Sequence, residues 1–196
     1  MKQEQVIELL LQSLEHEACG IDVYETALQC VRNDDLREEF EKYLDQTRNH
    51  VQILTEVCVA LEINPETKTP GREVVRMMGD SLVQAMKKAK SAGKPDAAEI
   101  VACECVVLAE TKDHLNWELI GQIAENGEGD GVQALKDAYD EVEDQEDEHL
   151  YHSRGWCREL WIQALGMKAV LPPPEEVKHV KTAISAARAE QSRKSS

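Results

Sequence analysis

Acidic and histidine side chains interrupt four apolar rows of this sequence, at positions where helical spacing would bury them. The rows span residues 6–31, 36–61, 100–124 and 135–160. The interrupting residues are Glu17, His50, Glu110, Asp113, His114, Glu146 and His149. A buried carboxylate without a positive partner is costly in free energy. Because no Lys or Arg interrupts the same rows, a bound metal ion is the expected source of positive charge.

The positions of these residues along the predicted helices place them at one level of a helical bundle. Glu17 lies nearly as many residues before the first turn as His50 lies after it. At the α-helical rise, both residues are therefore roughly 25 Å from that turn. Glu110 and Glu146 flank the second turn in the same way, at roughly 27 Å. Glu146 and His149 are three residues apart and so face one side of their helix. Carboxylate oxygen combined with imidazole nitrogen suits iron, manganese or zinc.

Length and composition favour one helical domain. The chain has 196 residues, of which 42% are hydrophobic and 31% are charged. Such a chain is long enough for one sizeable core, and its many Ala, Leu, Glu, Lys and Gln residues favour helix over strand. The formal net charge of −16 disfavours a nucleic-acid partner and attracts cations.

The cysteines and the N-terminal segment indicate a compartment. Six cysteines occur, at positions 19, 30, 58, 103, 105 and 157, and none forms a Cys-x-x-Cys pair. This spacing argues against a metal knuckle or a disulfide framework, and reduced thiols suggest the cytoplasm. Residues 1–5 lack the layout of a signal peptide, and no segment approaches the roughly 20 apolar residues that cross a bilayer. We therefore expect a soluble, cytoplasmic protein with no membrane partner.

Capping residues and turn residues divide the chain into helices. The predicted helices span residues 3–31, 35–62, 96–125 and 131–165, and a further amphipathic piece spans 72–90. Two short turns and one long connection give two helical hairpins, an all-α antiparallel four-helix bundle with a helical crossover between its second and third helices. The predicted bundle domain covers residues 1–167. Residues 168–196 are predicted to form a C-terminal tail with a short helix.

The order Glu, His, Glu and Glu-x-x-His along the four helices resembles the ferritin-like di-iron carboxylate superfamily. Glu17, followed seven residues later by Tyr24, is similar to the first metal-binding helix of rubrerythrins. The segments 43–54, 65–69, 96–102 and 109–113 resemble the bacterial stress-associated YciF type. The resemblance covers residues 12–165 and implies a ferritin-like four-helix bundle.

The same resemblance implies a function. It implies binding of one or two iron ions, with manganese or zinc as alternatives, and oxidation of Fe(II) by oxygen or peroxide in stress protection. The implied ligands are Glu17 and Glu146 as terminal carboxylates, Glu110 as the bridging carboxylate, His50 and His149 as nitrogen ligands, and Asp113 as a neighbouring or switching ligand. Flexible carboxylates suit an ion whose charge changes.

One residue departs from the superfamily pattern. Thr47 stands three residues before His50, where the pattern has a second Glu. Three alternatives remain: a two-metal site that Asp113 completes, a single-metal site, or a site that has lost its metal. The last two correspond to the alternative function, a non-catalytic helical stress or interaction protein. Association through the exposed crossover predicts a homodimer.

Overall fold

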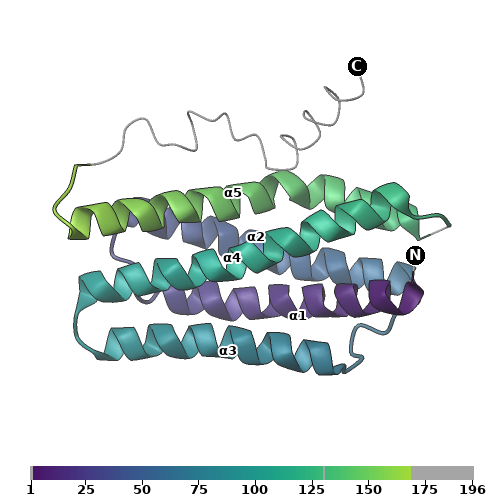
Figure 1. The fold of residues 1–196 in the computed structure, drawn as a ribbon, viewed down its shortest axis with the longest axis horizontal. Coiled ribbons are helices and arrows are strands. Elements are labelled where there is room, and N and C mark those ends of the chain that lie inside the picture. The colour runs from purple at the N-terminus through teal and green to yellow at the C-terminus, as the bar shows by residue number, and fades with distance from the viewer. Residues whose placement is uncertain (1, 130, 169–196) are drawn as a thin grey trace, which may run out of the picture.

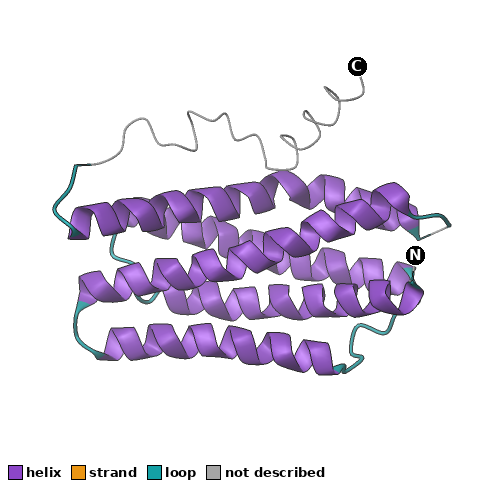
Figure 2. Cartoon of the chain, viewed as in Figure 1, coloured by secondary structure: helices purple, strands orange, loops and turns teal. Residues whose placement is uncertain are grey.

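The computed structural model describes residues 2–129 and 131–168, and over these ranges the chain is all-helical, as predicted. Five helices follow one another along the described chain (Figure 1; Figure 2). They are α1 (Gln3–Ala27), α2 (Asp34–Ala60), α3 (Pro70–Ser91), α4 (Pro95–Asn126) and α5 (Val132–Ala164). The short helix predicted near the C-terminus lies outside the described residues.

The helices form two antiparallel hairpins joined by a helical connection. α1 runs antiparallel to α2, and α4 runs antiparallel to α5 (Figure 1). The two hairpins pack through contacts of α1 with α4 and of α2 with α5. The connection between the hairpins contains α3, which lies along the outside of the assembly against α1 and α4. The helical crossover expected from residues 72–90 is therefore confirmed.

The apolar core is divided into two clusters. One contains Val23, Phe40, Tyr43, Met86 and Val106, and the other contains Leu10, Leu54, Trp117, Ile120 and Leu135. Along α1, Glu17 falls between Leu14 of the second cluster and Val23 of the first. A polar layer therefore separates two apolar layers within one bundle, which is where an unpaired charge is most costly.

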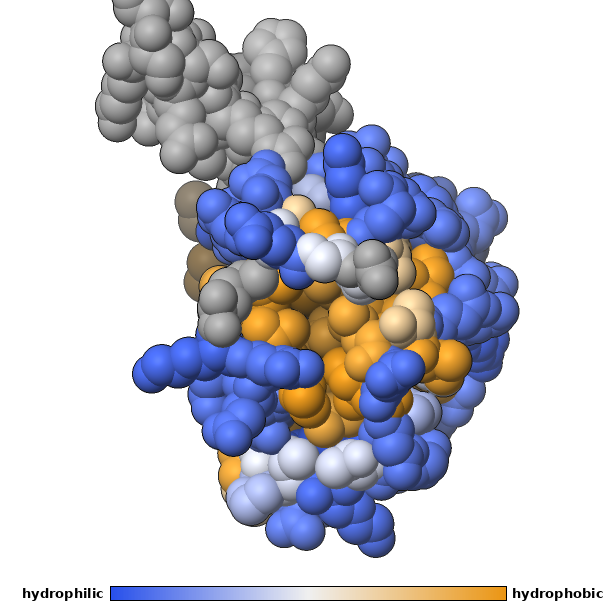
Figure 3. All heavy atoms as spheres, turned by 90° about the vertical axis from the view of Figure 1, so that its right-hand side faces the viewer, coloured by the Kyte–Doolittle hydropathy of each residue, from blue (hydrophilic) through white to orange (hydrophobic). Residues whose placement is uncertain are grey.

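One end of the bundle exposes part of the second cluster. Figure 3 shows this end, at which α4 connects to α5, with apolar side chains in a central hollow and hydrophilic side chains around it. The partly buried members of this cluster are Val6, Val51, Ile53, Leu61, Ile63 and Ile123. Among the described helices, none combines the length and apolar character that crossing a membrane requires.

The first helix is shorter than predicted. α1 ends at Ala27, whereas the apolar row predicts a helix to residue 31. The guanidinium of Arg37 donates to the carbonyl of Leu28 at 3.0 Å and so satisfies an acceptor near the helix end. The carboxylate of Glu99 accepts two backbone N–H groups of the following turn, at 2.7 and 2.8 Å. These tertiary contacts replace the last helical turn, because they satisfy backbone groups that a longer helix would pair.

α3 is fixed to α1 by ion pairs and by close packing. The Glu15 carboxylate accepts from Arg72 at 2.7 and 3.0 Å and from Arg76 at 2.6 Å. Burial acts to raise the pKa of Glu15, but the two guanidinium groups hold it below its ordinary value. One turn further along α3, a Cβ atom on Gly79 would lie 2.6 Å from the Cβ of Cys19. The helices thus approach closely only because residue 79 has no side chain.

Candidate metal centre

Five of the six predicted ligands meet in the middle of the bundle. They form two sets, Glu17 with His50 and Glu146, and Glu110 with Glu146 and His149. Within each set the ligand atoms lie within 4.8 Å of one another, and all five residues are buried. The side chains come from α1, α2, α4 and α5. Each set could hold a metal ion, because carboxylate and imidazole groups converge where a cation can contact all of them.

Glu146 is the carboxylate that the two sets share. Its Oε1 lies 3.1 Å from Nδ1 of His50 and 3.5 Å from Nδ1 of His149. Nδ1 of His50 also lies 3.4 Å from Oε1 of Glu17, and Nδ1 of His149 lies 3.6 Å from Oε2 of Glu110. The family resemblance implies a bridging role for Glu110. The structure instead places Glu146 between the two histidines, because its side chain projects from α5 towards both.

Two glutamines orient the histidine rings. Nε2 of His50 lies 3.0 Å from Oε1 of Gln145, and Nε2 of His149 lies 3.0 Å from Oε1 of Gln46. The amide nitrogen of Gln145 donates to the carbonyl of Glu141 at 3.2 Å, which turns its oxygen towards His50. His50 therefore donates through Nε2 and directs Nδ1 at the carboxylates, the arrangement a metal-binding imidazole requires.

Sequence reasoning missed both glutamines. Each precedes a histidine by four residues, as in Gln46 and His50 or Gln145 and His149, so a signal was present in the spacing. This spacing did not predict the contacts, because each glutamine contacts the histidine of the other helix and not the histidine of its own helix. Residues separated by four on one helix are neighbours, and this crossed pairing depends on how α2 and α5 pack.

Two aromatic residues contact the carboxylates from opposite sides. The indole N–H of Trp117 donates to Oε1 of Glu17 at 2.7 Å. Tyr24, seven residues after Glu17, places its hydroxyl within electrostatic reach of Glu110 without a well-formed hydrogen bond. Trp117 follows Glu110 by the same seven residues. Each hairpin thus supplies an aromatic residue to the acid of the other, and Trp117 is also a hydrogen-bond donor.

The carboxylates change the protonation of the site. Burial acts to lower the pKa of His50, but Glu17 and Glu146 outweigh it and raise that pKa to about 11. Burial raises the pKa of Glu146, and the charges of Glu17 and Glu110 raise it further. The neighbouring histidines act in the opposite direction but do not outweigh this effect. Burial also acts to raise the pKa of Glu110, but the adjacent His149 ring holds it below its ordinary value. Without a bound cation, a proton on His50 supplies positive charge to this layer.

Asp113, the sixth predicted ligand, lies beside the two sets rather than within them. It is buried, and its Oδ1 has no hydrogen-bond partner within the described part of the chain. Burial and the charges of Glu17, Glu146 and Glu110 raise its pKa well above the ordinary value. Thr47, which replaces the second Glu of the pattern, is also buried, and its methyl group lies 3.1 Å from the Cβ position of Gly20. No carboxylate therefore reaches the site from position 47.

Several buried polar atoms of this layer lack hydrogen-bond partners among the described residues. They are Oε2 of Glu17, Oε2 of Glu110, both carboxylate oxygens of Glu146, Nδ1 of His50 and Oδ1 of Asp113. Buried polar groups of folded proteins are normally satisfied. A cation bound among these atoms would satisfy them together, and the donor set fits a hard or borderline divalent ion.

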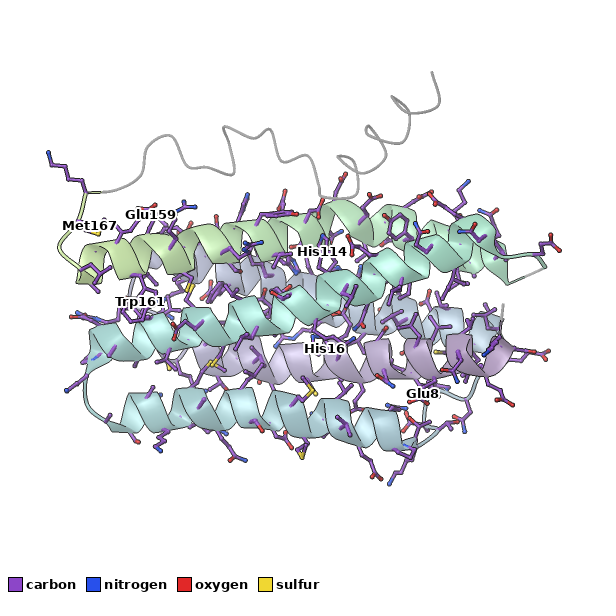
Figure 4. The ribbon with its side chains drawn as sticks, in the orientation of Figure 1. Glu8, His16, His114, Glu159, Trp161 and Met167 are labelled. Atoms are coloured by element: carbon purple, nitrogen blue, oxygen red, sulfur yellow. The ribbon has the colours of Figure 1, made fainter. Side chains whose placement is uncertain are left out.

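A second buried pair lies next to this layer. Nε2 of His114 is 2.6 Å from Oδ1 of Asp147, between α4 and α5 (Figure 4). Asp147 belongs to an acidic run at residues 137–148 of α5, yet it is only 5% exposed. Burial acts to lower the pKa of His114, but Asp147 outweighs it and raises that pKa. The pair links the two helices that carry Asp113 and Glu146.

Comparison with known proteins adds no relative. Searches of protein-family models, of curated proteins and of solved structures found no match to this chain. The function is therefore inferred from the site itself.

Proposed function

We propose that this protein is a ferritin-like metal-binding protein that holds one or two iron ions between its two helical hairpins. The observation that carries the proposal is Glu146. This buried carboxylate belongs to both acid–histidine sets; its Oε1 lies 3.1 Å from Nδ1 of His50, and its Oε2 has no hydrogen-bond partner among the described residues. A buried anion shared by two imidazoles and surrounded by further acids is stabilised by a cation and is costly without one.

The ligand chemistry favours iron or manganese over softer ions. Four carboxyl groups and two imidazoles lie in or beside the layer, and none of the described cysteines belongs to either set. Oxygen-rich sites with imidazole suit iron and manganese, whereas thiolates would favour zinc or copper(I). Bound iron would supply Fe(II)/Fe(III) electron transfer towards oxygen or peroxide, which is the activity proposed for stress protection.

The chain itself prepares the site for a cation. Gln145 and Gln46 hold the imidazoles so that Nδ1 faces the acids, and Trp117 holds one oxygen of Glu17. Burial excludes water and strengthens electrostatic attraction to a cation. Because a ligand nitrogen must be unprotonated, His50 gives up its proton when a cation binds.

The proposal is tested by metal analysis of the whole protein. The protein is purified without chelator, loaded anaerobically with Fe(II), desalted and measured by elemental analysis, alongside Glu146→Gln and the control Asp144→Asn on an exposed position of the same helix. We expect one or two ions per chain in the wild type and the control, and loss of bound iron in Glu146→Gln. A wild-type protein that retains no iron, manganese or zinc contradicts the proposal.

A second candidate function rests on Thr47. Because position 47 supplies no carboxylate, the site is asymmetric, and a single-metal or metal-free helical scaffold is the alternative. The two candidates differ in the effect of Glu110→Ala. In a metal-binding protein a divalent ion stabilises the wild type but not Glu110→Ala, whereas in a metal-free scaffold the ion stabilises neither protein.

A further inference from the structure

Two of the six cysteines lie against each other across the contact of α4 with α5. Cys103 is on α4, and its thiol donates to the carbonyl of Ser153 on α5 at 3.6 Å. Cys157 is one helical turn beyond Ser153 on α5, and it packs against the core cluster that contains Cys103. Neither residue contributes to the acid–histidine sets, so the proposed metal function does not account for this pair.

The two thiols differ in access to solvent. Cys103 is completely buried, whereas Cys157 is partly exposed. The nearby Cys103 thiol holds the pKa of Cys157 below its ordinary value, although burial acts in the opposite direction. In such an arrangement a soluble oxidant reaches one thiol and oxidises it. The second, shielded thiol then forms a disulfide with the oxidised sulfur.

The remaining cysteines lack this combination. Cys30 and Cys105 are within electrostatic reach of each other, but both are buried, and burial raises the pKa of each. Cys19 and Cys58 are also buried, with pKa values raised by burial. Among the described thiols, only Cys157 joins partial exposure to a second thiol on the facing helix.

We infer that Cys103 and Cys157 form a redox-active dithiol that hydroperoxides convert to an intrachain disulfide. The Cys157 thiolate attacks one oxygen of hydrogen peroxide, the O–O bond breaks, and Cys157 sulfenic acid and hydroxide form. The Cys103 sulfur then attacks the sulfenic sulfur, the S–O bond breaks, and the thiol proton leaves with the departing hydroxide as water. In total, two thiols and one peroxide give one disulfide and two water molecules, with two electrons passing from sulfur to oxygen.

The bond would connect two helices that carry metal-site residues. Cys103 precedes Glu110 by seven residues on α4, and Cys157 follows His149 by eight on α5, or ~10 and ~12 Å along the helices. A disulfide there would restrict movement of α4 against α5 near the acid–histidine layer. The inference itself does not depend on a bound metal, since the thiols react with peroxide directly.

The test uses the full chain, reduced and then freed of metal with a chelator. The protein is treated with hydrogen peroxide, remaining thiols are blocked with N-ethylmaleimide, and peptides are identified by mass spectrometry. We expect a monomeric product that has lost two hydrogen atoms, with Cys103 and Cys157 in one cross-linked peptide that dithiothreitol separates. Cys105→Ala, which removes another buried thiol of α4, should form the same cross-link.

Two variants test the order of the steps. Cys157→Ala should abolish the cross-link and leave Cys103 unoxidised at the same peroxide concentration. Cys103→Ala should leave a sulfenic acid on Cys157, which dimedone traps. The inference is overturned if wild-type Cys157 stays reduced, if it proceeds to sulfonic acid without a disulfide, or if Cys103 pairs with another cysteine. Because the protein is metal-free, each result is independent of whether iron binds.

Discussion

His50 on α2 and Gln145 on α5 hold each other across the bundle, with Nε2 of the imidazole 3.0 Å from Oε1 of the amide. The same contact occurs in reverse between His149 on α5 and Gln46 on α2, also at 3.0 Å. Each hairpin therefore orients the histidine of the other. The consequence is that both Nδ1 atoms face the acids of the central layer, and the orientation of the ligands depends on how the hairpins assemble.

Replacing Gln145 should weaken metal binding more than folding. In Gln145→Leu the imidazole of His50 loses the acceptor that fixes its ring, and loss of such a partner typically lowers metal affinity ~10–100-fold. Competition titration with a chromophoric chelator measures this change. Gln133→Met, on an exposed position of the same helix, should bind as the wild type does. Equal affinity for Gln145→Leu would show that the amide does not orient a ligand.

Stability of the metal-free protein should fall as the pH rises above neutrality. The folded-state pKa of His50 is raised from 6.5 to about 11, so the stabilisation from its proton is complete below pH 6.5 and is lost as the pH approaches 11. The slope reaches at most ~1.4 kcal/mol per pH unit for one proton. Urea unfolding in chelator at pH 6.5, 7.5 and 8.5 measures it.

Two controls accompany the pH series. His50→Gln removes the titrating group and should flatten the slope between pH 6.5 and 8.5. Saturation with a divalent ion should flatten or reverse it, because the cation replaces the proton and binds better as the pH rises. A metal-free wild type that becomes more stable over this range would show that His50 is not the proton carrier of the layer.

Asp113 should matter to the metal and little to the metal-free fold. Burial and the neighbouring acids raise its pKa and so favour the protonated carboxyl, which an amide of the same shape replaces in Asp113→Asn at a cost of about 1 kcal/mol or less. If Asp113 compensates for Thr47, the variant loses at least ~10-fold in metal affinity. Asp137→Asn, an exposed change, is the control for lost surface charge. Unchanged affinity in Asp113→Asn would favour the single-metal alternative.

The packing of α3 on α1 should not tolerate a methyl group at position 79. In Gly79→Ala the new Cβ would lie 2.6 Å from Cβ of Cys19, so the helices must separate. We expect a loss of ~1–3 kcal/mol in unfolding free energy from overpacking, even though Ala favours helix over Gly by ~1 kcal/mol. Urea denaturation measures the balance. As a control, Ser81→Ala on an exposed position of α3 should change the free energy of unfolding by less than ~0.5 kcal/mol. If Gly79→Ala were more stable than the wild type, the close approach of α3 to α1 would be contradicted.

The helices and the level of the site followed from the sequence for physical reasons. Helical periodicity is a local property, and Asn33 begins α2 because its side-chain oxygen accepts from the backbone N–H of Leu36. Equal distances from the turns were enough to bring Glu17 and His50 to one level. The end of α1 was not predictable in this way, since Arg37 and Glu99 terminate it from other helices.

Residue type and spacing alone determined that this chain is helical and that its buried acids and histidines share one layer, because periodicity and axial rise act within each helix. The tertiary structure decided that Glu146 rather than Glu110 is shared and that the glutamines cross to the opposite histidines. It also decided that the Cys103 thiol contacts α5 at Ser153, one turn before Cys157. These contacts depend on the rotation of each helix about its axis and on side-chain rotamers, which only the packing of all helices together selects.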